Sequence, residues 1–151
     1  MTLVAIVALG SNLGDRRANL EAGLRALGTL GAVTPSPLVM ETADESGLGP
    51  DYLNTVARLE SELETPCALL EALLRIELDL GRDRSAGRNA PRTLDLDLIE
   101  VRGLEGRWTW PSPEDLRILG GELTLELPHP RAQGRRFVQE PMRRLGAAPR
   151  S

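Results

Sequence analysis

The 151-residue sequence predicts an α+β fold, with a ferredoxin-like βαββαβ core followed by a C-terminal hairpin and helix. Three observations lead to this prediction. Two segments carry leucines at helical spacing behind typical helix-start residues. Four short segments are apolar or alternate between apolar and polar residues, as strands do. Their order is strand, helix, strand, strand, helix, strand, which forms an antiparallel sheet with helices packed on it. The chain, 1–151, fits a single domain.

The first half of the core begins with an unbroken apolar run. Residues 3–9 (LVAIVAL) are rich in valine and isoleucine, which predicts a buried strand. Leucines then recur at helical spacing from Asp15, a good N-terminal cap, to Gly28. Residues 32–42 look extended, and their prolines indicate an edge strand. A polar loop at residues 43–50 completes this half.

The second half of the core repeats the pattern. Residues 52–63 alternate sufficiently to predict a strand. Thr-Pro at residues 65–66 is a strong helix start, and an apolar stripe follows it. On this helix Glu71 and Arg75 are one turn apart and can pair. Residues 93–101, which begin with alternating leucine and aspartate, predict the last core strand.

The remaining third of the chain has weaker patterns. Residues 102–114, which contain Trp108 among glycines and prolines, are predicted to be an irregular insertion. Residues 116–127 predict two short strands that turn at the glycines 120–121. A helix is expected over residues 135–145.

Composition excludes several classes of function. The hydrophobic fraction of 41% and charged fraction of 26% are ordinary for a globular protein. A net charge of −4 and an aromatic fraction of 3% argue against a nucleic-acid binder. The chain has no lysine, which excludes a Walker-A loop and a Schiff base. Cys67 and His129 are the only residues of their types, so a disulfide and a multi-histidine site within the chain are excluded.

Localisation and assembly are expectations from the same composition. The apolar run at residues 3–9 is too short to cross a membrane and is a poor secretory signal. We therefore expect a cytoplasmic protein that contacts no membrane. We expect a monomer, with a weak dimer as the alternative.

Residues 81–98 combine an arginine-rich segment with an aspartate-leucine alternation. Because strand side chains alternate between faces, Asp95 and Asp97 would share one face, with Cα atoms roughly 7 Å apart. Carboxylates suit magnesium, and guanidinium groups suit phosphate oxygens. The arginines are Arg82, Arg84, Arg88 and Arg92. The first hypothesis is a metal–polyphosphate site; a solvated sheet face beside a solvated loop is the alternative.

Other candidate residues leave two interpretations open. Tyr52 and Asn54 would share one face of a strand. They can be ordinary surface residues, or the tyrosine ring and the asparagine amide can bind a heterocycle. His129 lies between two prolines, where it can serve phosphate or an acid–base step, or simply a turn. Residues 10–14 join a strand to a helix without the spacing of a glycine fingerprint, so a structural turn is favoured over a phosphate loop.

Short motifs along most of the chain resemble those of a known family. They are ALGSNLGD at residues 8–15, ET at 41–42, DYLN at 51–54, RIEL-x-x-GR-x-R at 75–84, PRTLDLDL at 91–98, LPHPR at 127–131 and RRFV at 135–138. With them the chain resembles the 6-hydroxymethyl-7,8-dihydropterin pyrophosphokinases of folate biosynthesis. PRTLDLDL in this order with the other motifs is highly specific.

The resemblance implies an activity and a set of site residues. The enzyme would transfer pyrophosphate from ATP to the pterin hydroxymethyl oxygen and release AMP, by in-line displacement assisted by two Mg²⁺ ions. The implied catalytic residues are Asp95, Asp97, Arg82 and Arg92, and the two aspartates are the metal ligands. The implied ATP contacts are Glu77, Arg84, Arg88, Arg92, His129 and Arg135. The implied pterin contacts are Thr42, Tyr52, Asn54 and Phe137.

The sequence also departs from the family pattern. Asn89 stands where the family commonly has a tryptophan that helps cover the pterin, and the family usually continues beyond the last segment. These departures motivate one alternative, a catalytically weakened ATP- and pterin-binding homologue. A second alternative is an RNA-binding module that stacks bases on its sheet, which the acidic charge and scarce aromatics disfavour.

Overall fold

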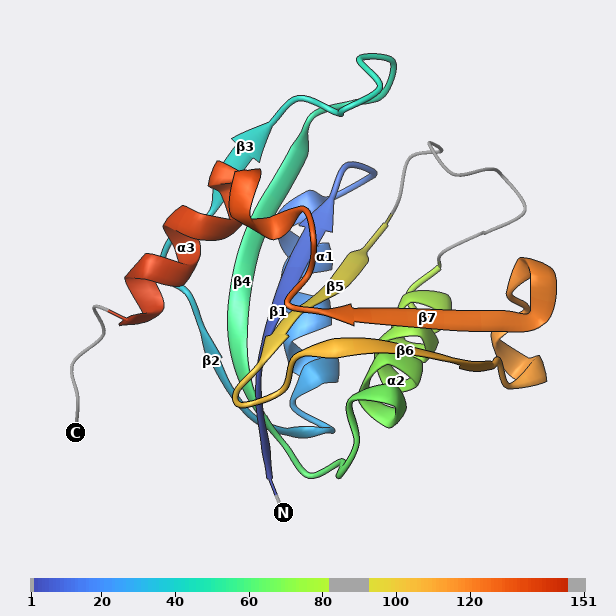
Figure 1. Cartoon of the computed structure of the whole chain (residues 1–151). Helices are drawn as coiled ribbons and strands as arrows, with labels where there is room; N and C mark the ends of the chain where they lie inside the picture. Colours follow the sequence, from blue (N-terminus) through green and yellow to red (C-terminus); the bar gives the residue numbers. More distant parts are fainter. Residues whose placement is uncertain (1, 82–92, 147–151) are drawn as a thin grey trace.

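The computed structural model describes residues 2–81 and 93–146 (Figure 1). The strands of the main sheet are β1 Leu3–Ser11, β2 Gly31–Pro35, β3 Met40–Thr42, β4 Tyr52–Ser61 and β5 Asp95–Val101. The α-helices are α1 Arg16–Leu27, α2 Pro66–Asp79 and α3 Arg136–Gly146. Strands β6 Gly106–Pro111 and β7 Glu122–Leu127 form a separate two-stranded sheet.

The main sheet has the order β2-β4-β1-β5, and β3 pairs with β4. The paired strands are antiparallel. Each crossover helix therefore connects two strands that are separated by one strand between them. This is the ferredoxin-like arrangement, so the predicted fold is confirmed. The predicted edge strand at residues 32–42 is divided into β2 and β3, which both pair with β4.

The two crossover helices begin where the sequence predicts. The Asp15 side chain accepts a hydrogen bond from the Ala18 amide (3.1 Å) at the start of α1. Thr65 does the same for the Ala68 amide (3.1 Å) at the start of α2, and Pro66 occupies the first turn. Both caps satisfy an amide that has no partner within the helix.

The sheet lies between two layers (Figure 1). One face packs on α1 and α2 through a core that includes Ala5, Val7 and Leu9 of β1. The opposite face carries a smaller cluster with α3, in which Val56 and Val138 are buried. None of the helices in the described ranges combines the length and apolarity needed to cross a membrane.

Two predictions for residues 102–127 are wrong. The segment predicted to be irregular contains strand β6, and the hairpin joins β6 to β7 instead of lying within residues 116–127. Residues 114–116 and 119–121 form short 3-10 turns. Trp108 and Trp110 alternate with polar residues, which is a strand pattern, and both rings pack against the main core. The prolines obscured this pattern, but Pro111 ends the strand, where proline is tolerated.

Candidate active site

A cavity of about 710 Å³ opens on the α3 face of the sheet and extends around the edge of β5 toward α2 and β7. Its floor comes from β1, β4 and β5, one end is bounded by β3 and α3, and the other by α2 and β7. A volume of this size is typical of small-molecule sites.

The strand register places the central residues of the cavity in one row. Gly10 of β1 is paired with Asp95 of β5 on one side and with Asn54 of β4 on the other. Because neighbouring strands are about 4.8 Å apart, Asp95 and Asn54 are separated by about 10 Å along this row. A Cβ atom at Gly10 would lie 3.1 Å from Asn54 Oδ1 and 3.3 Å from the Tyr52 ring. Glycine thus keeps the floor open between a carboxylate and an amide.

Asp95 and Asp97 lie on the same face of β5 and both line the cavity. Leu96 and Leu98 point to the opposite face and are buried in the main core. The predicted shared face is therefore confirmed. Two carboxylates fit magnesium, which takes one or two carboxylates together with substrate phosphates. Within residues 2–81 and 93–146, no group of three or more His, Cys, Asp or Glu side chains is placed to hold a metal, so substrate oxygens would have to complete the coordination.

Glu77 of α2 has a backbone partner that the sequence did not indicate. Its side chain is 2% exposed, and Oε2 accepts a hydrogen bond from the Leu96 amide at 2.7 Å. Within the described residues β5 is an edge strand, so this amide points away from β1 toward α2. Glu77 thus fixes the backbone between the two aspartates. The only sequence signal was that Glu77 lies beside the apolar stripe of α2. Its partner, the Leu96 amide, is 19 residues away, so no local pattern indicated the contact.

Replacing Glu77 with alanine is expected to lower the free energy of unfolding by about 1–3 kcal/mol, because the buried Leu96 amide loses its acceptor. Glu77→Gln should cost less, since its amide oxygen can still accept. Urea unfolding measures both, with Glu21→Ala on the exposed face of α1 as the control. Equal losses for the alanine and glutamine variants would contradict this role.

The residues predicted to contact the pterin lie at the α3 end of the cavity: Thr42, Tyr52, Asn54 and Phe137. Asn54 is 6% exposed, and its Nδ2 donates to Thr42 Oγ1 (2.9 Å) and to the Met40 carbonyl (3.3 Å). This hydrogen-bond pattern fixes the amide orientation and places Oδ1 beside Gly10. The structure therefore gathers these four residues in one place.

His129 and Arg135 follow β7 and line the cavity near the aspartates. The His129 amide donates to the Ile99 carbonyl (2.7 Å), and its Nδ1 accepts from the Arg131 amide (3.2 Å). In the neutral ring the proton is therefore on Nε2. Arg135 pairs with Glu45 at 2.9 Å, and its guanidinium lies 5.6 Å from the centroid of the Phe137 ring.

Burial, followed by the charges of Arg135 and Arg131, lowers the pKa of His129 below its ordinary 6.5. We expect the single imidazole titration in a proton NMR experiment to lie below that value. Because the unfolded chain then binds the proton more readily, the free energy of unfolding decreases as pH falls through 6.5 toward the folded pKa. His129→Gln should remove this part of the pH dependence. A wild-type titration at or above 6.5 would contradict it.

The other end of the cavity has an apolar part that was not predicted, beside the polar side chains of Arg107, Thr124 and Glu126. Leu70 and Leu74 of α2 line one side, and Ile118, Leu123 and Leu125 line the part that comes from the hairpin and its connecting turns. These residues are far apart in the sequence. Each of them also fits the spacing of an ordinary core residue, so no local sequence signal distinguished a cavity-lining residue from a core residue.

Known proteins match most of this chain in sequence. The family model described as 7,8-dihydro-6-hydroxymethylpterin-pyrophosphokinase (HPPK) matches residues 6–147. The chain belongs to this family. The 2-amino-4-hydroxy-6-hydroxymethyldihydropteridine pyrophosphokinase of Pseudomonas aeruginosa is 37% identical over 139 residues, which are 90% of this chain and 76% of that protein. One from Bacillus subtilis is 34% identical over 146 residues, 94% of this chain and 77% of that protein.

Longer proteins share the HPPK fold. The folate synthesis bifunctional protein of Pisum sativum is 34% identical over 91% of this chain but only 24% of its own length. A Plasmodium falciparum HPPK-DHPS structure superposes with a TM-score of 0.70 at 11% sequence identity. It covers 91% of this chain, which spans 40% of that solved chain. At this identity the structure supports the fold alone.

The structure does not describe the four arginines that the sequence predicts for this site. Arg82, Arg84, Arg88 and Arg92 lie outside the described residues, as does Asn89. Their roles remain predictions from the sequence. Glu77, His129 and Arg135, the other predicted ATP contacts, all line the cavity.

Proposed function

We propose that this chain transfers the terminal pyrophosphate of ATP to the hydroxymethyl oxygen of 6-hydroxymethyl-7,8-dihydropterin, giving the pterin diphosphate and AMP in folate biosynthesis. The observation that carries the proposal is the row of Asp95, Gly10 and Asn54 across one cavity, in a chain of the HPPK family. We expect the two substrates, bound side by side in this cavity, to reach both the carboxylate pair and the Asn54 amide.

The pterin is assigned to the α3 end of the cavity. Tyr52 and Phe137 offer aromatic faces for a flat bicyclic ring. Asn54 Oδ1 faces the cavity because Nδ2 is held by Thr42, so this oxygen can accept from a ring N–H or amino group. The pterin hydroxymethyl group then extends along the row toward Asp95.

The nucleotide is assigned to the end between α2 and β7. The apolar side chains of Leu70, Leu74 and Leu123 suit a purine base. His129 and Arg135 supply donors for the phosphates, and the neutral His129 ring can donate from Nε2. The arginines of residues 82–92 are expected to add further phosphate contacts.

The side chains of this site position groups and balance charge. Asp95 and Asp97 would hold two magnesium ions, which when bound neutralise the triphosphate and favour in-line attack. Glu77 keeps the β5 backbone between the two carboxylates in place through Leu96. Rigid placement of both substrates lowers the entropic part of the barrier. No side chain has to form a covalent intermediate.

The deciding experiment combines the protein, magnesium, ATP and hydroxymethyl-dihydropterin and identifies the nucleotide product. Formation of AMP that depends on the pterin supports pyrophosphate transfer. Formation of ADP, or no pterin-dependent product, would contradict it. ATP binding without AMP release would favour the weakened homologue. A cytoplasmic location and a monomeric state are further expectations, to be checked by fractionation and light scattering.

A further inference from the structure

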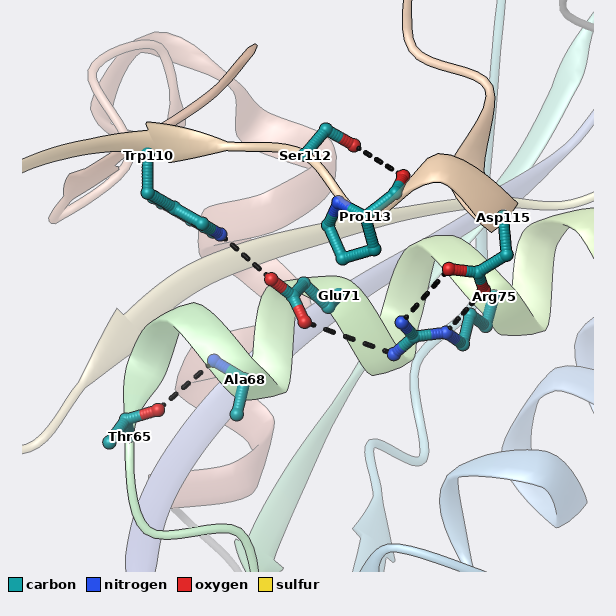
Figure 2. Close-up of polar contacts among 8 residues, drawn as sticks. All are labelled: Thr65, Ala68, Glu71, Arg75, Trp110, Ser112, Pro113 and Asp115. Atoms are coloured by element: carbon teal, nitrogen blue, oxygen red, sulfur yellow. Dashed lines mark hydrogen bonds and ion pairs between the residues drawn. The ribbon is translucent and has the colours of Figure 1, made fainter. Parts of the chain in front are cut away.

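A chain of polar contacts holds the β6–β7 hairpin against α2 (Figure 2). Trp110 Nε1 donates to Glu71 Oε2 at 2.8 Å. Arg75 donates two hydrogen bonds to Asp115, from Nε to Oδ2 at 2.7 Å and from Nη2 to Oδ1 at 3.3 Å. Glu71 Oε1 and Arg75 Nη1 lie 3.9 Å apart, which connects the two contacts. We refer to Glu71, Arg75, Trp110 and Asp115 as the clamp.

The clamp joins the same elements that line the apolar end of the cavity. Leu70 and Leu74 of α2 line it, as does Leu123 on the hairpin side. On α2 the cavity-lining leucines alternate with the clamp residues. Leu70 and Leu74 are one helical turn apart, and each is followed directly by a clamp residue, Glu71 or Arg75. One side of the helix therefore lines the apolar end of the cavity, which we call the slot, and the adjacent side holds the hairpin through the clamp.

Apolar packing anchors the hairpin on the main core, and the clamp adds directional polar contacts between the hairpin side and α2. Leu125 and Leu127 of β7 are buried in the main core. Beyond β6, the turn at residues 114–116 returns toward α2, where Asp115 accepts the two hydrogen bonds from Arg75. Two parallel hydrogen bonds from a guanidinium restrict the geometry more than a single contact does.

The clamp contributes more to geometry than to stability. The side chains of Arg75 and Asp115 are 43% and 58% exposed, and exposed ion pairs contribute little to stability. The hydrogen bond from Arg75 lowers the pKa of Asp115, so this pair stays charged at neutral pH. Glu71 is better shielded, at 21% exposed, where it accepts from the Trp110 indole.

We propose that Glu71 and Arg75 are positioning residues that, through Trp110 and Asp115, set the width of the slot for the nucleotide base. They thereby set the affinity and base preference for ATP. This inference rests on the proposed function, because it requires ATP to bind at this end. The clamp lies on the far side of the slot from the pterin residues, so pterin binding should be unaffected.

The test uses Trp110→Phe, which keeps an aromatic ring but removes the N–H with the five-membered part of the indole, and Asp115→Ala, which removes both hydrogen bonds from Arg75. Glu114→Ala is the matched control, since it removes a neighbouring exposed carboxylate from the same turn. We expect the KM for MgATP and the calorimetric Kd for α,β-methylene-ATP to rise ~5-fold in each clamp variant. The values of kcat and of the pterin KM should stay unchanged, and the preference for ATP over GTP should fall.

The outcomes separate the two proposals. Unchanged nucleotide affinity in both variants, with an active wild type, would overturn the clamp and leave the proposed function standing. Equal losses for ATP and pterin would also overturn it, because they would show general loosening. A wild type that binds no nucleotide would overturn both. The double variant should lose less than the product of the single losses, since the contacts form one connected network.

Discussion

Replacing Asp97 with asparagine is expected to lower kcat by ~10³-fold or more, because the proposed metal site loses one of its two carboxylate charges. The fold should survive. Asparagine has nearly the size and shape of aspartate, and Asp97 lines the cavity, so the melting temperature of the metal-free protein should change little. Steady-state turnover with magnesium and both substrates, together with thermal unfolding without metal, measures the two effects.

The matched control for Asp97 is Glu100→Gln. It makes the same change of charge on the same strand, but Glu100 does not line the active-site cavity. The control should keep turnover within about twofold, as expected for a surface substitution. Near-normal turnover of Asp97→Asn would exclude this carboxylate from the metal site.

Replacing Asn54 with alanine is expected to weaken pterin binding by ~10²-fold, because the buried amide is the group proposed to read the ring. The variant also leaves Thr42 Oγ1 and the Met40 carbonyl without their shared donor. The Kd follows from a titration of pterin fluorescence, and nucleotide affinity is measured in parallel. ATP affinity should change little, since the nucleotide is assigned to the other end of the cavity.

Ser61→Ala is the matched control for Asn54, since Ser61 is fully buried on the same strand and accepts from the Leu63 amide. The Ser61→Ala substitution removes a side-chain hydrogen bond at a residue that does not line the cavity. It should therefore lower stability without weakening pterin binding. If Asn54→Ala weakened ATP and pterin equally, the separation into two subsites would be wrong.

The core of the fold was predictable because its signals are local. The caps at Asp15 and Thr65 and the apolar run of β1 each determine an element within a few residues. The β6 strand was missed because Pro111 and Pro113 were given more weight than the alternation of Trp108 and Trp110. What stabilises β6 is packing of those rings on a core formed by distant segments.

The geometry of the candidate site was predictable where a motif carries its residues. Asp95, Asp97, Tyr52 and Asn54 alternate within strands, and the structure places them on the predicted faces. The hydrogen bond of Glu77 was not predictable, since its acceptor oxygen meets the Leu96 amide on a different element. The same holds for Trp110 and Glu71, which are 39 residues apart.

By itself the sequence determined the elements of the core, the face on which each carboxylate lies and the family, because periodicity, caps and motifs are written in neighbouring residues. Only the tertiary structure decided that Gly10 separates Asp95 from Asn54, that Glu77 fixes β5, and that a clamp on α2 holds the hairpin. Each of these depends on strand register or on packing between distant segments. No local pattern specifies such pairings, since many registers satisfy the same alternation.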